Sequence, residues 1–310
     1  MSCYISIDLG GTIVKTGLVR DGKVVASSRI EASSGKGLGP MLEPLARAVD
    51  KLVADLHGDS LEGVAMAFPG IVDFDAGRAL STNAKYDDAP SLDMRAWVRR
   101  RWNAPFIMDN DARMAMIGEW TYGAGRECRN MVMMTIGTGI GTGVLLDGRP
   151  IYGRSGCAGS LGGHLTVDYK GRHCTCGNVG CIEAQASSFF LPQIIREDMR
   201  LSAAFRQHPS NYDFKNLTGK YRTGDRDAAM VLESCMDAWS AAVVNYIHAY
   251  DPEKVIIGGG VMKSGDIILP YIRERVRSLA WCPAGEVELG MTALGDDAAL
   301  LAAPYYFSLR

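Results

Sequence analysis

Hydrophobic and polar positions follow a strand-like pattern at the start of the chain. Short runs rich in β-branched residues occupy Tyr4–Leu9, Thr16–Val19 and Val24–Ile30, with glycine turns between them. Asp21-Gly22, between the second and third runs, is a hairpin signal. The pattern predicts a three-stranded meander.

Helical spacing follows the meander and then alternates with short apolar runs. Leu38–Leu56 carries apolar residues three and four positions apart and stops before Gly58, which is typical of the residue after a helix. The remaining elements predicted in this half are a buried strand at Val64–Phe68 that Pro69-Gly70 ends, a helix at Asp93–Trp102, a strand at Phe106–Met108 and a helix at Ala112–Trp120.

The same order of elements begins again near residue 131. Runs at Met131–Ile136 and Thr142–Leu146 surround a glycine-rich turn, and Asp147-Gly148 marks the next turn. After an insertion rich in glycine and cysteine, the pattern predicts helices at Ala228–Tyr250, Ile267–Leu279 and from Asp296 toward Ala303, with a strand at Val255–Ile257. The repetition predicts two α/β halves that meet near residues 110–120.

Composition excludes several classes of protein. Of 310 residues, 47% are apolar and 22% charged, and 36 glycines stand beside 12 prolines, which excludes a disordered or collagen-like chain. The net charge of −2 leaves no positive excess for nucleic acid or an anionic membrane. The first eight residues lack the pattern of a secretory signal, and the longest charge-free run, Asn130–Leu146, is too short for a membrane helix. We therefore expect a cytoplasmic protein with no nucleic-acid or membrane partner.

Two glycine loops are candidates for phosphate binding. Asp8-Leu9-Gly10-Gly11-Thr12 places a carboxylate at a strand end before glycines that let backbone N–H groups approach a phosphate, and Gly137–Gly143 repeats this chemistry in the second half. Each loop alone is equally compatible with a tight hairpin turn. Val14 breaks the Walker A pattern, and the glycines at 137, 139 and 141 do not have Rossmann spacing.

Three of the eight cysteines, Cys174, Cys176 and Cys181, lie within eight residues, which predicts a metal site. A fourth ligand could come from His164 or His173. His173 adjoins Cys174, which makes joint ligation awkward, whereas His164 lies ten residues away. Three thiolates and an imidazole in four-coordinate geometry favour Zn²⁺, and a site closed by four protein ligands is structural.

Together these motifs resemble the actin/hexokinase superfamily and, within it, the ROK family of glucokinase-like and N-acylhexosamine kinase-like sugar kinases. The residues that carry the resemblance are Asp8–Thr12, Phe68–Gly70, Asn83, Asp109–Ala112, Gly137–Gly143, Gly156–His164, Cys174–Glu183 and Ile257–Gly260. The resemblance implies an α/β fold with two ribonuclease H-like lobes around a central cleft. It places one lobe at 1–116 with a returning C-terminal helix at about 296–310, and a larger lobe with the zinc loop at 117–295.

The resemblance also assigns roles to residues. An Asp or Asn before a helix is ordinarily an N-cap, but in ROK kinases the Asp of the Asn-Asp pair is the general base, which carries over to Asp111. It implies ATP with Mg²⁺, a sugar phosphorylated at carbon 6, a zinc ligand at His164 and assembly into a dimer. The implied sugar-binding residues are Gly70, Asn83, Asn110, Asp111, His164 and Glu183, and the implied nucleotide-binding residues are Asp8, Gly10, Gly11, Thr12, Gly137, Thr138, Gly139, Gly258, Gly259 and Gly260.

The chain departs from the family pattern at two positions. Ser160 stands where these kinases carry the Glu of Glu-x-Gly-His, and Arg113 stands where Asn is common. Either the substrate is a different sugar, substituted or acidic near carbon 1 or 2, or the chain is a non-catalytic sugar sensor. The retained Asp111 and glycine loops favour catalysis, and we expect no DNA-binding module because the phosphate strand begins at Tyr4.

Overall fold

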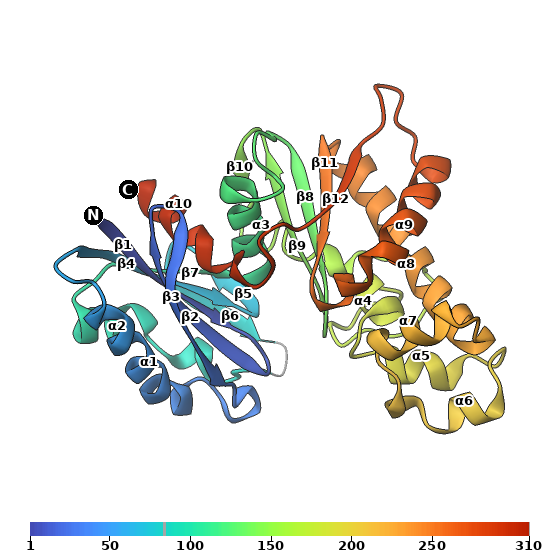
Figure 1. Cartoon of the computed structure of the whole chain (residues 1–310), viewed down its shortest axis with the longest axis horizontal. Coiled ribbons are helices and arrows are strands. Elements are labelled where there is room, and N and C mark those ends of the chain that lie inside the picture. Colours follow the sequence, from blue (N-terminus) through green and yellow to red (C-terminus); the bar gives the residue numbers. More distant parts are fainter. Residues whose placement is uncertain (83–84, 310) are drawn as a thin grey trace. The chain divides into compact units, whose positions relative to one another are not determined.

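The computed structural model describes residues 1–82 and 85–309 (Figure 1). Asn83, one of the residues expected to bind sugar, lies outside these described residues. By internal contacts the chain divides into two compact units. Unit 1 comprises Met1–Glu127, Pro150–Ser160 and Ala293–Arg310, and unit 2 comprises Cys128–Arg149 and Leu161–Thr292. The division after Glu127 differs from the predicted boundary after residue 116, because residue 116 lies inside a helix that stays whole in unit 1.

The sheet of unit 1 begins with the predicted meander. Strands β1 (Ser2–Leu9), β2 (Ile13–Arg20) and β3 (Lys23–Glu31) pair antiparallel, and the expectation of three neighbouring strands is confirmed. Asp21 and Gly22, both with positive φ, form the tight turn between β2 and β3. Strands β4 (Ser60–Phe68) and β7 (Phe106–Asn110) then extend the sheet in parallel beyond β1, in the order β3-β2-β1-β4-β7.

Helices cover both faces of this sheet. Helices α1 (Leu42–Ala54) and α2 (Met94–Trp102) cover one face, where β1 contributes buried Ile5 and Ile7 to an apolar core (Figure 1). Helices α3 (Asp111–Tyr122) and α10 (Ala303–Ser308) pack on the opposite face. The approach of α10 is close, because a Cβ on Gly63 of β4 would lie 2.2 Å from the Phe307 ring.

Three parts of unit 1 differ from the sequence predictions. Helix α1 is shorter than Leu38–Leu56, since short 3₁₀ turns precede it and its C-cap is Asp55. The hairpin of β5 (Gly70–Asp73) and β6 (Arg78–Thr82) was not predicted. The predicted helix from Asp296 toward Ala303 is wrong: this stretch forms two 3₁₀ turns, and a separate helix begins where Pro304 lacks the N–H that a continuous helix needs.

Unit 2 repeats the strand order of unit 1. Strands β8 (Met131–Ile136), β9 (Ile140–Leu146) and β10 (Arg149–Pro150) stand in the places of the first meander, although contacts group Pro150 with unit 1. Strands β11 (Lys254–Gly258) and β12 (Glu288–Met291) add in parallel, giving β10-β9-β8-β11-β12. The predicted duplication of an α/β half is confirmed at the level of strand order.

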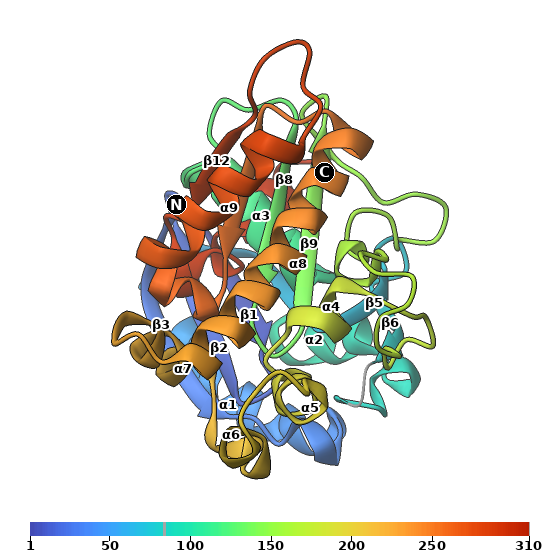
Figure 2. The same cartoon turned by 90° about the vertical axis from the view of Figure 1, so that its right-hand side faces the viewer.

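Two long helices pack against each other and against the second sheet (Figure 2). They are α8 (Arg226–Tyr250) and α9 (Gly265–Leu279), and both begin close to their predicted positions. The shorter helices are α4 (Ile182–Ala186), α5 (Leu191–Glu197), α6 (Ala203–Gln207) and α7 (Phe214–Arg222). Trp239 of α8 is buried and donates its indole N–H to the Ala186 carbonyl at 2.9 Å, which fixes α4 against α8.

No helix within the described part of the chain is both long and apolar enough to cross a lipid bilayer.

Two helical glycines provide a test of the packing. A Cβ on Gly118 of α3 would lie 1.9 Å from the Ala298 carbonyl oxygen, whereas one on Gly219 of α7 meets nothing within 4 Å. We expect Gly118→Ala to destabilise unit 1 by about 1–3 kcal/mol through steric overlap. Gly219→Ala should stabilise α7 by about 0.4–1 kcal/mol. Thermal unfolding followed by circular dichroism would measure both, and equal midpoints for the two variants would contradict the close packing of α3.

Candidate active site and metal centre

Asp111 begins α3 directly after β7, and its neighbour performs the capping. The Asn110 side-chain oxygen accepts the Arg113 backbone N–H at 3.1 Å, so Asn110 is the N-cap. One Asp111 oxygen, Oδ1, accepts the Ala112 N–H at 2.8 Å and an Asn110 Nδ2 hydrogen at 3.1 Å. The N-cap explanation of this motif therefore applies to Asn110. Asp111 accepts one further first-turn N–H through Oδ1 alone.

The electrostatic surroundings raise the pKa of the Asp111 carboxyl toward neutral pH. Burial and the nearby Asp8 carboxylate raise the pKa of Asp111 to about 6, while the Ala112 N–H and Lys85 oppose the rise. A carboxyl with a pKa of about 6 is mostly ionised at neutral pH and is still basic enough to accept a proton.

Asp8 lies one residue before the end of β1, the central strand of the same sheet. Burial raises the pKa of Asp8, and the Lys15 ammonium, 3.5 Å away, opposes this effect. Lys15 also pairs with Asp296 at 3.3 Å. Residue types alone did not point to Lys15 or Lys85 as charges near these acids; the pairing of β1 with β2 places Lys15 directly opposite Asp8.

The first glycine loop is held by its carbonyl groups. Gly10 O accepts the Tyr86 hydroxyl at 2.8 Å, Gly11 O accepts the Ser34 hydroxyl at 2.9 Å, and Thr12 O accepts the Ala32 N–H at 2.9 Å. Because the C=O and N–H of a trans peptide point in opposite directions, the N–H groups that follow these carbonyls face away from their anchors. A Cβ on Gly10 would lie 2.3 Å from the Ile13 carbonyl oxygen, so the loop requires glycine there.

Gly70 supports the motif of Asn110 and Asp111. Its carbonyl accepts the second Nδ2 hydrogen of Asn110 at 3.1 Å. With both amide hydrogens and one lone pair in use, the Asn110 side chain retains one lone pair to accept a hydrogen bond. A Cβ on Gly70 would lie 2.4 Å from the Ser81 carbonyl oxygen, which explains the glycine after Pro69.

The second glycine loop, between β8 and β9, is fastened within unit 2. Gly137 O and Thr138 O accept the N–H groups of Ser188 and Phe189 at 3.1 and 3.0 Å. Glu183 accepts the Ile140 N–H through Oε2 at 2.9 Å. Glu183 is buried and bonded to this loop, so it is not a solvated acid at a helix start. Its assignment to a sugar hydroxyl remains a prediction.

The glycine triplet follows β11 at the same edge of the second sheet. Gly258 pairs with Thr135 of β8, one residue before that strand ends. Gly259 has a φ of +93°, and a Cβ there would lie 2.3 Å from the Ile136 carbonyl oxygen. Gly260 is exposed and meets nothing within 4 Å, so its missing side chain leaves open surface beside the second loop.

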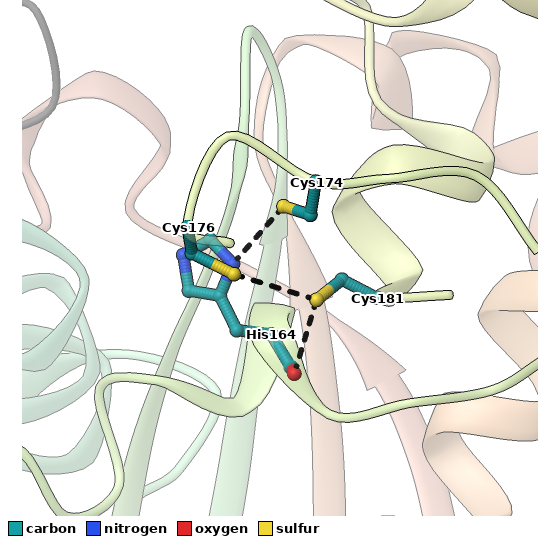
Figure 3. Close-up of side chains that lie close together, drawn as sticks. All are labelled: His164, Cys174, Cys176 and Cys181. Carbon is teal, nitrogen blue, oxygen red and sulfur yellow. Dashed lines mark hydrogen bonds between the residues drawn. The ribbon is translucent and has the colours of Figure 1, made fainter. Parts of the chain in front are cut away.

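Four side chains of unit 2 form a metal-ligating cluster (Figure 3). The ligand atoms of His164, Cys174, Cys176 and Cys181 lie within 4.8 Å of one another. Cys174 Sγ is 3.6 Å from His164 Nδ1, and Cys176 Sγ is 3.6 Å from Cys181 Sγ. A tetrahedron with Zn–S bonds of about 2.3 Å has edges of about 3.8 Å, so this donor set fits Zn²⁺ in type and spacing.

The chain reaches this geometry through tight turns. Gly177 and Gly180 both have positive φ, and a Cβ on Gly180 would lie 1.6 Å from the Asp168 carbonyl oxygen. His173 is not in the cluster, since it bridges to Val179 through its backbone. Of the two histidines considered, the structure brings His164 to the thiols.

Ser160 has no carboxylate counterpart in the loop before His164. Its hydroxyl donates to the Cys157 carbonyl at 3.1 Å and closes a turn of that loop. The missing Glu is thus replaced by a group that bonds within its own segment.

Comparisons of sequence and of structure with known proteins point to the same family. The sequence model of the ROK family matches residues 4–308. A glucokinase of Thermotoga maritima is 33% identical over 96% of this chain and 95% of its own length. A xylose repressor of Caldicellulosiruptor bescii is 26% identical over 87% of this chain and 69% of its own. The crystal structure of a ROK hexokinase from Thermus thermophilus has a TM-score of 0.82 at 26% identity and 99% coverage of both chains.

The raised pKa of Asp111 predicts a pH-dependent stability. Between the ordinary pKa near 4 and the folded value near 6, the folded state holds a proton that the unfolded state has lost, so stability falls as pH rises. We expect Asp111→Asn to be more stable than wild type at pH 8 by about 1–3 kcal/mol. The difference should vanish below pH 4.

Denaturant unfolding at both pH values would measure this effect, with Asp55→Asn at the exposed end of α1 as the control. An Asp111→Asn variant with no gain at pH 8 would show that the carboxylate is not destabilised by its surroundings.

Proposed function

We propose, from the premise that this chain belongs to the ROK family, that it transfers the γ-phosphoryl group of ATP to a sugar hydroxyl. The acceptor is a hexose or hexose derivative, phosphorylated at carbon 6. The observation that carries the proposal is the carboxylate of Asp111, which is not the N-cap of α3 and has a pKa raised to about 6.

Asp111 is the general base of this reaction. Phosphoryl transfer with a loose transition state requires alignment and charge stabilisation more than strong base catalysis, so the acid orients the hydroxyl and takes its proton late. The remaining lone pair of Asn110 accepts a hydrogen bond from a neighbouring sugar hydroxyl. Because Asn110 is itself held by Gly70, Gly70 shapes the sugar site through that amide.

Main-chain amides of the two glycine loops bind the phosphates. In unit 1 the loop residues are Gly10, Gly11 and Thr12, and in unit 2 they are Gly137, Thr138 and Gly139. The N–H groups of Gly10 and Gly137 already donate to Asp8 O at 3.1 Å and to Gly139 O at 3.0 Å. These two glycines therefore shape their loops, and the amides of the other four residues bind the phosphates. In both loops the carbonyls are engaged by the protein, which supports the assignment of their amides to an anion. Asp8 would hold the Mg²⁺ that accompanies ATP, and Gly258, Gly259 and Gly260 would take the adenosine.

The substrate differs from an ordinary free hexose near carbon 1 or 2. A hydrogen bond to a charged group contributes about 1.5–3 kcal/mol, so the absence of the Glu lowers the binding affinity for such a hexose by roughly 10- to 150-fold. A sugar that is substituted or acidic at this end does not depend on that bond. Glu183 and the loop that ends at His164 complete the sugar site.

The cluster of His164, Cys174, Cys176 and Cys181 holds a structural Zn²⁺. All four ligands come from the protein, so the ion orders its loop and activates no water. The donor geometry supports this assignment.

A non-catalytic sugar sensor is the alternative, and the similarity to a xylose repressor is the observation in its favour. An assay of ATP consumption over a panel of hexoses, amino sugars and sugar acids, with products identified by mass, distinguishes the two. Sugar binding in calorimetry without any phosphorylated product would support the sensor.

Substitution of Asp111 tests the catalytic role. We expect Asp111→Asn to fold and to lose about 10²–10⁴-fold in turnover, because the hydroxyl loses its base. Wild-type kcat/KM should rise with pH through about 6 as Asp111 ionises. Steady-state kinetics would measure both, and wild-type rates in the variant would remove Asp111 from the mechanism.

Substitution of Cys176 tests the metal site. We expect Cys176→Ser to lower the zinc content and the thermal midpoint, since three ligands bind the ion more weakly than four. Elemental analysis of chelator-free protein would measure the metal, with Cys282→Ser, outside the cluster, as the control. Full zinc content in Cys176→Ser, or none in wild type, would contradict the assignment.

A further inference from the structure

Arg113 is a charged side chain with no solvent exposure, although it lies only two residues after the proposed base. Its Nη1 donates to Asp109 Oδ1 at 2.6 Å, and Asp109 is also fully buried. A buried charge pair is costly unless further hydrogen bonds satisfy most of the polar atoms of both partners. In this pair Arg113 Nε has no partner among the described residues, and both Nη atoms are hydrogen-bonded. The further hydrogen bonds of Arg113 and Asp109 connect α3 and β7 to other parts of unit 1.

The second guanidinium nitrogen holds a distant part of unit 1. Arg113 Nη2 donates to the carbonyls of Gly156 and Ala158 at 2.7 and 2.8 Å. These residues belong to the segment Pro150–Ser160, here called the crossing segment, which lies between two stretches of unit 2 in sequence and packs in unit 1. The guanidinium also lies over the ring of Tyr152, 4.4 Å from its centre.

Asp109 completes the network with four donors. Oδ1 accepts Arg113 and the Asn110 backbone N–H at 2.7 Å, and Oδ2 accepts the hydroxyls of Tyr152 and Tyr306 at 2.9 and 2.7 Å. Four bonds match the acceptor capacity of a carboxylate. Asp109 is therefore saturated, and it ties the end of β7 to the crossing segment and to α10.

These contacts argue against a direct meeting of Arg113 with substrate. The side chain has no exposed surface, and two of its nitrogens are committed to Asp109 and to carbonyl groups of the crossing segment. The crossing segment ends at Ser160, which stands in place of the Glu of Glu-x-Gly-His, and it leads directly into Leu161–His164. The planar fork of Arg suits this double task, and a Lys ammonium does not.

We propose that Arg113 is a positioning residue that sets the crossing segment relative to Asp111. Arg113 lies on α3, the helix that begins at Asp111, and its guanidinium binds the carbonyls of the crossing segment. One side chain therefore links the proposed base to this segment. The proposal rests on the proposed function for its kinetic consequence, but the fastening of the crossing segment can be tested without activity.

The test compares three variants with wild type. Arg113→Ala removes the fork, Arg113→Lys keeps the charge, and Arg113→Met with Asp109→Asn removes both charges so that no buried charge is left unpaired. Arg101→Met on α2, which breaks an exposed ion pair with Asp50 of α1, is the matched control. If Arg113→Ala does not fold, the charge-free double variant carries the test.

Hydrogen exchange supplies the readout that needs no substrate. The Ala158 N–H donates to Tyr152 O at 3.0 Å within the crossing segment. We expect exchange over residues 153–160 to accelerate at least tenfold in the Arg113 variants and to remain unchanged in Arg101→Met. Unchanged exchange in a folded Arg113 variant would overturn the proposal.

Kinetics supply the second readout. We expect the sugar KM to rise about tenfold or more, since small displacements of a positioned group are costly, with the KM for ATP within about twofold of wild type. Guanidinium ions should partly restore Arg113→Ala. Equal increases in both KM values would overturn a role in positioning. Absence of phosphorylation by wild type would refute the proposed function alone, because the exchange result stands separately.

Discussion

The parallel pairing of three strands in unit 1 is the constraint on which the candidate site depends. The register aligns Asp8 of β1 with Ala67 of β4, and Ala67 with Asp109 of β7. Because parallel strands end at the same edge of a sheet, this alignment brings the first glycine loop and the start of α3 to one edge. A shift of one residue in either pairing would turn the acids toward the opposite face of the sheet.

Two acids of one short motif acquire different properties from their surroundings. Asp109 receives four hydrogen bonds, one of them from the Arg113 guanidinium, so its charge is compensated and its role is structural. Asp111 receives only weak compensation through Oδ1 and lies near another carboxylate, which raises its pKa. The difference arises from the number of donors that each carboxylate meets, and Asn110 allows it by taking over the helix cap.

The sequence allowed prediction of the features that depend on local patterns. Strand order, the metal-ligating cluster at Cys174 and the glycine loops follow from periodicity and spacing, together with a family resemblance. The network of Arg113 could not be predicted, because its partners Gly156 and Ala158 lie more than forty residues away and contribute only backbone carbonyls. The burial of Glu183 could not be predicted for the same reason, because its partner is a backbone group, the Ile140 N–H, that is distant in sequence.

The two glycine loops are anchored by different kinds of group. Side-chain hydroxyls of Tyr86 and Ser34 hold the first loop, whereas peptide N–H groups of Ser188 and Phe189 hold much of the second. Any residue except proline supplies a peptide N–H, and the Phe189 side chain is 61% exposed. Over evolutionary time, positions 188 and 189 are thus free to drift in side-chain identity, while positions 34 and 86 must each retain a hydroxyl.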